Sequence, residues 1–175
     1  MSNYLAKFDE LNKLGKDYKG SLSDLLDTLY SEMRDAYVQG WEDVDKQTND
    51  IRYKPDEDEI EELIFLLYDD KDAFDLMEEA YNEGDGNRIS RIVSTEFHRM
   101  YNAGAYDRAK KGGSTLKVWV TMKDDKVRPT HEYIDEVGIP LEAEFYTYDG
   151  DSALYPGGFS NANNNVNCRC WLEFA

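Results

Sequence analysis

The hydrophobic period of this sequence changes once, near Gly112 and Gly113, and that change restricts the fold more than any other feature. Before the two glycines, apolar residues recur every three or four positions, which predicts amphipathic helices. After them, residues 116–122 alternate and are rich in β-branched and aromatic side chains, which is typical of a strand. The sequence therefore predicts an α+β fold, with a helical N-terminal region over residues 1–87 and a small β-containing C-terminal module over residues 88–175.

Capping and turn residues divide the chain further. Ser21 suits a helix N-cap, because its hydroxyl can accept a hydrogen bond from the first helical turn, and Gly20 before it separates two helices within residues 4–44. Pro55 suits the first turn of a second helical unit, which we expect to break near residues 69–70 and to end at residues 84–86. The other expected elements are a third helix over residues 88–110, strands over residues 143–148 and 168–174, a short helix within residues 130–137 and a loop over residues 161–165.

Composition limits the class of partner. A hydrophobic fraction of 41% and an aromatic fraction of 13% exceed those of an acidic disordered chain, so we expect a folded protein. The net charge of -17 repels phosphate backbones, which disfavours direct nucleic-acid binding and favours basic protein surfaces. No stretch approaches the roughly 20 apolar residues that span a bilayer, and the N-terminus lacks the pattern of a signal peptide. We therefore expect a cytoplasmic product with no membrane partner.

The C-terminal third concentrates charged, aromatic and sulfur-bearing residues at short gaps. In chain order they are Lys117, Trp119, Asp124, Asp125, Arg128, His131, Asp135, Pro140, Phe145, the Pro156-Gly157-Gly158 loop and Asn167-Cys168-Arg169-Cys170. This ordered set resembles the Mu F type minor head protein family of tailed bacteriophages. The resemblance extends over residues 90–175 and includes Thr95, Glu96 and Asn102 on the preceding helix. Glu136 stands where that family commonly has glycine.

The resemblance implies a minor virion component of a phage or prophage, acting in head morphogenesis or in DNA packaging and delivery. Binding, rather than catalysis, would be the mechanism. The implied partners are portal, capsid or scaffold proteins, with homo-oligomerisation as a further option. The implied locations are the host cytoplasm during assembly and then the virion.

His131, Cys168 and Cys170 offer the donor atoms of a metal site. Alternate residues of a strand point to one face, so the two cysteines would project together and Arg169 away from them. Two thiolates and an imidazole are ligands that Zn²⁺ prefers, and Asp125, Asp135 or water would supply a fourth. The alternative is that the cysteines are small packing residues and that His131 hydrogen-bonds locally. Two cysteines this close do not make the disulfide framework of a secreted protein, which favours a reducing compartment.

The other residues of the set have structural interpretations. Asp125 and Arg128 are spaced to form an ion pair that fixes a turn beside His131. Lys117 and Trp119 share one strand face, where Trp119 would enter the core, and Asn167 is typical of a turn before the last strand. His98, in the third helix, we interpret as an ordinary buried or surface histidine.

Two other functions stay open from the sequence. A Cys–His pair oriented by Asp135, or a bound metal, would give a hydrolase or nuclease. The acidic run over residues 56–62 would alternatively mimic DNA and occupy a basic protein. The sequence has no Walker loop, GxGxxG, HExxH or GxSxG element, so we predict a protein that is not an enzyme and has no cofactor other than zinc.

Overall fold

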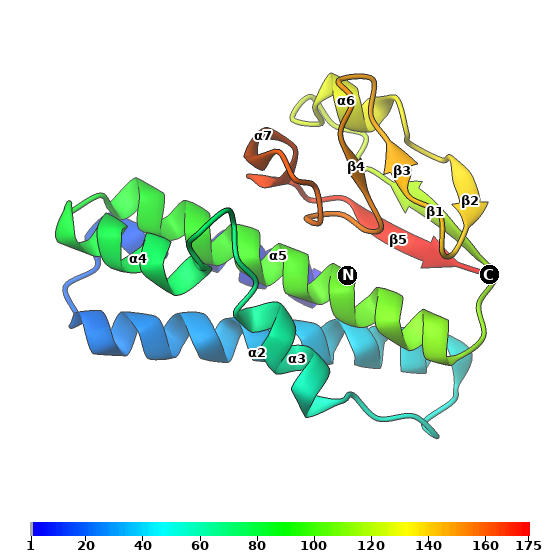
Figure 1. The fold of residues 1–175 in the computed structure, drawn as a ribbon, viewed down its shortest axis with the longest axis horizontal. Coiled ribbons are helices and arrows are strands. Elements are labelled where there is room, and N and C mark those ends of the chain that lie inside the picture. Colours follow the sequence, from blue (N-terminus) through cyan, green and yellow to red (C-terminus); the bar gives the residue numbers. More distant parts are fainter. Residues whose placement is uncertain (1) are drawn as a thin grey trace.

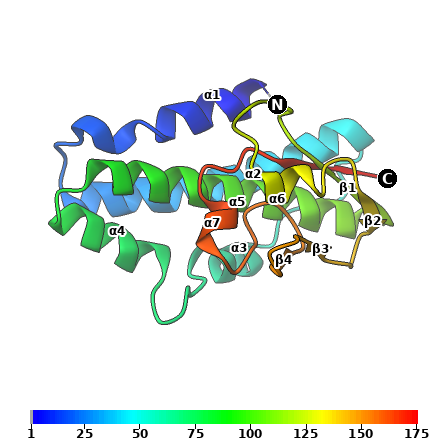
Figure 2. The ribbon, with the colours of Figure 1, turned by 90° about the horizontal axis from the view of Figure 1, so that it is seen from above.

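Two long helices that run in the same direction, α2 (Leu22–Thr48) and α5 (Gly86–Lys111), form the axis of the molecule (Figure 1). The computed structural model describes residues 2–175. Seen from above, α1 lies along one side of this pair, and α3 and α4 lie along the other (Figure 2). The remaining elements are α1 (Ser2–Leu11), the 3-10 helix η1 (Leu14–Asp17), α3 (Glu57–Ile64), α4 (Ala73–Asn82), β1 (Leu116–Val120), α6 (Pro129–Glu132), β2 (Gly138–Pro140), β3 (Phe145–Tyr146), β4 (Ser152–Ala153), α7 (Ala162–Asn165) and β5 (Trp171–Phe174).

Two glycines bring α2 and α5 into backbone contact. A Cβ atom added to Gly40 would lie 1.9 Å from the carbonyl oxygen of Tyr101, and one added to Gly104 would lie 2.0 Å from the carbonyl oxygen of Tyr37. Each helix therefore places a glycine against the backbone of the other. Any larger side chain at either position would force the two helices apart.

Polar side chains cap the N-termini of α2, α3, α4 and α5. Ser21 accepts a hydrogen bond from the Asp24 backbone, as predicted for the N-cap of α2. Asp56 and Asp85 cap α3 and α5 in the same way, and Asp72 forms a capping box with Asp75 at the start of α4. These side chains satisfy backbone N–H groups that have no partner within the helix.

The C-terminal module contains two small antiparallel sheets. The larger has the strand order β2-β1-β5, with Trp119 opposite Leu172, and the smaller pairs β3 with β4. Figure 1 shows this module lying above α5, with β5 nearest to that helix. Helix α5 is therefore the element that connects the helical layer to the sheet.

Hydrophobic side chains form two cores, and α5 contributes to both. The first core lies among the helices and contains Val93, Phe97 and Met100 of α5. The second lies in the module and contains Tyr106 and Ala109 of α5. The α+β class is confirmed, whereas the division between residues 87 and 88 stays a prediction because α5 is shared.

Several predicted elements have different bounds in the structure. Helix α3 begins after the N-cap Asp56, so Pro55 lies before the helix rather than in its first turn. The expected strands over residues 143–148 and 168–174 form only over Phe145–Tyr146 and Trp171–Phe174. The expected loop over residues 161–165 is wrong, because Asn161 caps a short helix, α7, through the backbone of Asn163. Within residues 2–175, no helix has the length and apolarity needed to cross a membrane.

Candidate functional site

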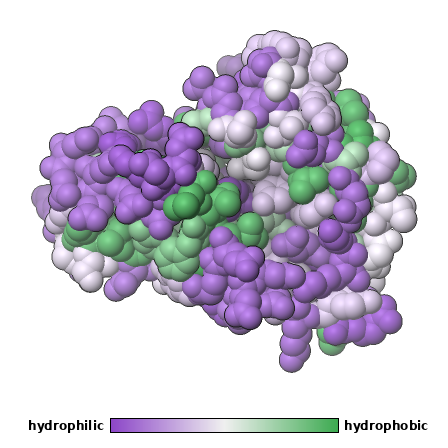
Figure 3. All heavy atoms as spheres, in the orientation of Figure 1, coloured by the Kyte–Doolittle hydropathy of each residue, from purple (hydrophilic) through white to green (hydrophobic). Residues whose placement is uncertain are grey.

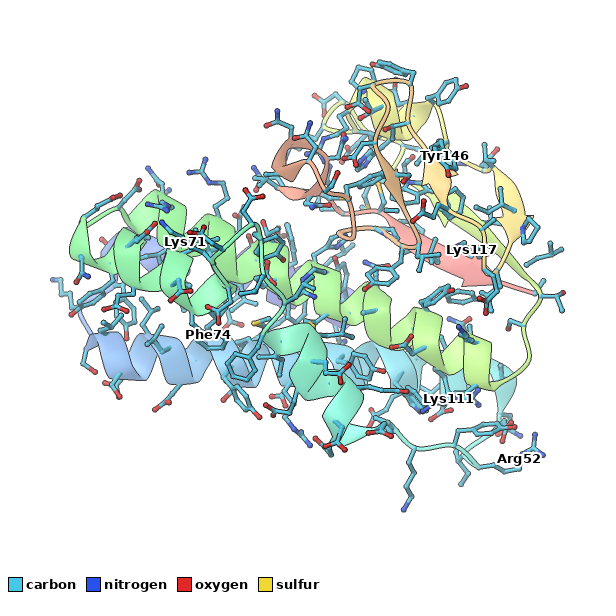
Figure 4. All side chains as sticks on the ribbon, viewed as in Figure 1. Arg52, Lys71, Phe74, Lys111, Lys117 and Tyr146 are labelled. Atoms are coloured by element: carbon cyan, nitrogen blue, oxygen red, sulfur yellow. The ribbon has the colours of Figure 1, made fainter. Side chains whose placement is uncertain are left out.

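The candidate site lies against the buried face of β1. Lys117 and Trp119 are both fully buried on this face; the sequence predicted the shared face and the burial of Trp119, but not the burial of Lys117. Lys117 Nζ donates a hydrogen bond to the Leu154 carbonyl oxygen (2.7 Å) and lies 4.9 Å from the centre of the Tyr106 ring, on the side of the sheet that faces α5 (Figure 4). Burial lowers the pKa of Lys117 to about 8, because the charged ammonium loses hydration there.

His131 enters the site from the short helix α6, which begins at Pro129. Its imidazole is buried between two aromatic rings: the Trp119 ring meets it edge-on at 5.2 Å, and the Phe159 ring stacks on it at 5.4 Å. Among the side chains of the described residues, His131 Nε2 has no hydrogen-bond partner. The ring is therefore held by apolar packing, and Nδ1 is the nitrogen that meets polar neighbours.

The two cysteines lie in the short segment between the turn at residues 166–167 and β5, not in the strand itself. Asn167 adopts a positive φ of 57°, which turns the chain, and this agrees with the turn predicted there. Arg169 points away from the cysteines and donates two hydrogen bonds to the Asp124 carboxylate, at 2.7 and 2.8 Å. Cys168 and Cys170 face the same side, as predicted, and burial alternates over residues 168–170 although this segment precedes the strand.

Both cysteine sulfurs approach the same nitrogen of His131. Cys168 Sγ lies 3.5 Å and Cys170 Sγ lies 3.4 Å from His131 Nδ1. The ligand atoms of the three residues all lie within 4.8 Å of one another, and all three side chains are buried. The structure thus brings together the three residues that the sequence singled out as metal ligands.

The two thiols have opposite pKa shifts. Burial raises the pKa of the Cys168 thiol, but hydrogen bonds with Cys170, His131 and His98 and the charge of His98 outweigh burial and hold that pKa well below its ordinary value. The hydrogen bond with Cys168, together with burial, raises the pKa of Cys170 well above its ordinary value. Cys168 is therefore the member of the pair that more readily becomes a thiolate.

The predicted Asp125–Arg128 ion pair is wrong. Arg128 instead donates hydrogen bonds to the carbonyl oxygens of Asn164 (2.8 Å) and Val166, and within residues 2–175 it has no carboxylate partner. Asp135 accepts a hydrogen bond from the Thr121 backbone at 2.8 Å, and neither Asp125 nor Asp135 belongs to the His131 cluster. Arg128 and Asp135 therefore fix the backbone around the cluster and do not ligate or orient His131.

Sequence reasoning gave no structural role to several buried polar residues that position the module. On α5, Glu96 and Arg99 form a buried ion pair (2.6 Å), and Arg99 also donates to the carbonyl oxygen of Leu63 at the end of α3. In the module, the Asp151 carboxylate accepts hydrogen bonds from residues 152, 160, 161 and 164. The i, i+3 spacing of Glu96 and Arg99 was visible in the sequence, whereas the partners of Asp151 meet only in the fold.

The space beside the cluster is small. A cavity of about 10 Å³ borders His131, Cys168 and Cys170. That volume accommodates about one water molecule. Both cysteine side chains are buried beside this cavity.

Comparison with known proteins places this geometry in a family. The sequence profile of the phage Mu protein F like family matches residues 58–173, from α3 to β5. The chain belongs to this family. The Mu F region therefore includes the whole cluster, the sheet and the buried Glu96–Arg99 pair of α5.

Two curated relatives match part of the chain. The minor head protein GP7 of Bacillus phage SPP1 is 30% identical over 83 residues, which cover 46% of this chain and 27% of that protein. The NAD(+)–arginine ADP-ribosyltransferase EFV of Enterococcus faecalis (strain ATCC 700802 / V583) is 33% identical over 84 residues, which cover 47% of this chain and 17% of that protein. The matches thus span less than a third of the length of either relative. No solved structure matches the chain.

Proposed function

We propose that this protein is a phage or prophage minor head protein that acts in head morphogenesis by binding a portal or capsid protein. The observation that carries the proposal is the Mu F family match over residues 58–173, supported by the similarity to a minor head protein of another phage. The ADP-ribosyltransferase match covers 17% of that protein, so its activity is not carried over. Under this proposal the protein is made in the host cytoplasm and becomes part of the virion.

The surface of the helical layer supports binding to another protein. Phe65, Leu66 and Leu67, in the loop after α3, are 47%, 43% and 60% exposed, and we call them the apolar loop. Figure 3 shows apolar side chains gathered over this loop near the middle of one face. Exposed apolar side chains surrounded by polar ones are typical of a protein-binding surface. The net charge of -17 adds a preference for a basic partner.

The direct experiment is a binding measurement with purified full-length partners. The portal protein and the major capsid protein encoded with this chain are each immobilised, and binding of the purified chain is measured at low and high salt. We expect binding to one of them, weakened by salt because charge attraction contributes. Mass spectrometry of purified heads is expected to detect the chain in few copies.

Matched variants test the apolar loop. Replacing Leu66 and Leu67 together with serine should weaken binding by about tenfold or more, since each removes exposed apolar area from the contact. Replacing Tyr146, which is 66% exposed on the C-terminal module, with serine is the control and should leave binding unchanged. Absence of the chain from purified heads, together with no binding to either partner, would refute the proposed function.

A further inference from the structure

All the histidines and cysteines of the chain gather in one place. The sequence has two of each, and His98, His131, Cys168 and Cys170 are each at most 4% exposed. They come from three separate parts of the fold: His98 from α5, His131 from α6, and the cysteines from the segment before β5. His98 is near enough to lower the pKa of the Cys168 thiol by its charge, so it neighbours the three-residue cluster.

One ring nitrogen of His131 faces two sulfurs, although that nitrogen can make only one full hydrogen bond. A neutral imidazole has one acceptor nitrogen with one lone pair, so Nδ1 can accept a hydrogen bond from only one of the two thiols. Its distances to Cys168 Sγ (3.5 Å) and Cys170 Sγ (3.4 Å) are nevertheless almost equal. Tetrahedral zinc, with Zn–N near 2.0 Å and Zn–S near 2.3 Å, separates such ligand atoms by about 3.5 Å. One ion between the three atoms would use all of them at once.

A metal-binding histidine ordinarily makes a hydrogen bond with the ring nitrogen that does not bind the metal, and His98 has such a bond. Its Nδ1 is hydrogen-bonded to the hydroxyl of Tyr4 on α1, and Asn102 Nδ2 lies 3.5 Å from each ring nitrogen. A hydrogen bond at one ring nitrogen orients the ring and fixes which nitrogen is free to bind a metal. His98 lies outside the set of three whose ligand atoms are within 4.8 Å of one another, so it would have to move toward the cysteines to complete the site.

We propose that this chain binds one Zn²⁺ through His131, Cys168 and Cys170, with His98 as the fourth ligand. Two thiolates balance the charge of the ion, so a closed site of this kind leaves no uncompensated charge in the interior. The site joins α5 to the module by bonds to α6 and to the segment before β5. It has a structural role, and it stands independently of the proposed function in head assembly.

Metal content and geometry test the proposal on the full chain. Elemental analysis of the freshly purified protein is expected to give one zinc per chain. X-ray absorption should show two sulfur ligands near 2.3 Å and two nitrogen ligands near 2.0 Å. Removing the metal with a chelator should lower Tm by roughly 10 °C, and adding Zn²⁺ should restore it.

Single variants identify the ligands. We expect zinc affinity to fall by more than about 100-fold in each ligand variant: Cys168→Ser, Cys170→Ser, His131→Asn and His98→Asn. Tyr4→Phe removes only the hydroxyl that bonds His98, so it should weaken zinc affinity by about 10- to 100-fold. Tyr133→Phe, on the exposed surface beside α6, is the matched control and should leave zinc affinity unchanged.

Two results would overturn the proposal. If the wild-type protein contains no zinc and gives no thiolate-to-metal absorption band on addition of Co²⁺, the cluster does not bind metal. If His98→Asn binds zinc with wild-type affinity, His98 is not a ligand. Because these measurements use the isolated chain, a negative result leaves the portal-binding experiment unaffected.

Discussion

Replacing Gly104 with alanine tests the central packing of the molecule. The added Cβ would lie 2.0 Å from the Tyr37 carbonyl oxygen, whereas ordinary contacts begin near 3.4 Å, so α2 and α5 must separate locally by about 1.4 Å. The obstacle is backbone, which cannot rotate away as a side chain can. Overpacking costs about 1 to 3 kcal/mol or more, and alanine returns about 1 kcal/mol of helix propensity. Because the obstacle is backbone, we take the upper end of this cost and expect a net loss of about 2 kcal/mol in the free energy of unfolding.

Equilibrium unfolding in urea, followed by circular dichroism and by tryptophan fluorescence, measures this loss as a lower midpoint at unchanged slope. Gly40→Ala should cost a similar amount, because its Cβ would lie 1.9 Å from the Tyr101 carbonyl oxygen. The double variant should cost less than the sum, since one separation of the helices relieves both contacts.

The control is Gly138→Ala, where the nearest atom to an added Cβ is Val118 Cγ2 at 3.6 Å. This variant should stay within about 0.5 kcal/mol of the wild type. If Gly104→Ala unfolds at the wild-type midpoint or above it, the two helices are not in backbone contact, and the reasoning fails.

Two further predictions concern the module. Burial lowers the pKa of Lys117 from 10.5 to about 8, so between these values the unfolded chain binds more protons than the native one and this group makes stability rise with pH. Lys117→Met should flatten that rise in urea unfolding between pH 8 and about pH 9.5, and an unchanged slope would contradict the assignment. Glu136 has a positive φ of 58° and an exposed ion pair with Lys123. A left-handed conformation costs a non-glycine residue about 1 kcal/mol, and the exposed ion pair contributes less than that. Glu136→Gly should therefore raise the free energy of unfolding by about 0.5 kcal/mol. A thermal midpoint below that of the wild type would argue against this.

The Glu136 position shows how a sequence pattern acquires a physical reason from the fold. The Mu F family, which the sequence resembles, commonly has glycine at this position. The structure shows that the chain is left-handed there, in the turn between α6 and β2, where the Glu136 N–H donates to the Trp119 carbonyl oxygen at 2.8 Å. Glycine adopts this conformation without the steric cost that Glu136 bears.

The sequence by itself determined the features that depend on neighbouring residues. The change of period near Gly113 predicted the α+β class, the Ser21 cap predicted the start of α2, and alternation placed Lys117 and Trp119 on one strand face. These signals are local because backbone geometry repeats every few residues. The ordered motif residues also indicated the family, which the match over residues 58–173 confirmed.

Only the tertiary structure decided which distant polar groups meet. It paired Arg169 with Asp124 and gave Arg128 backbone carbonyl partners in place of Asp125. It also brought His98, which the sequence gave no reason to choose, beside Cys168 and the Tyr4 hydroxyl. Side-chain partners of this kind are separated by tens of residues, and no local period records them. They follow from the cost of burying a polar group without a partner, which most of the polar groups enclosed by the helices and sheet avoid.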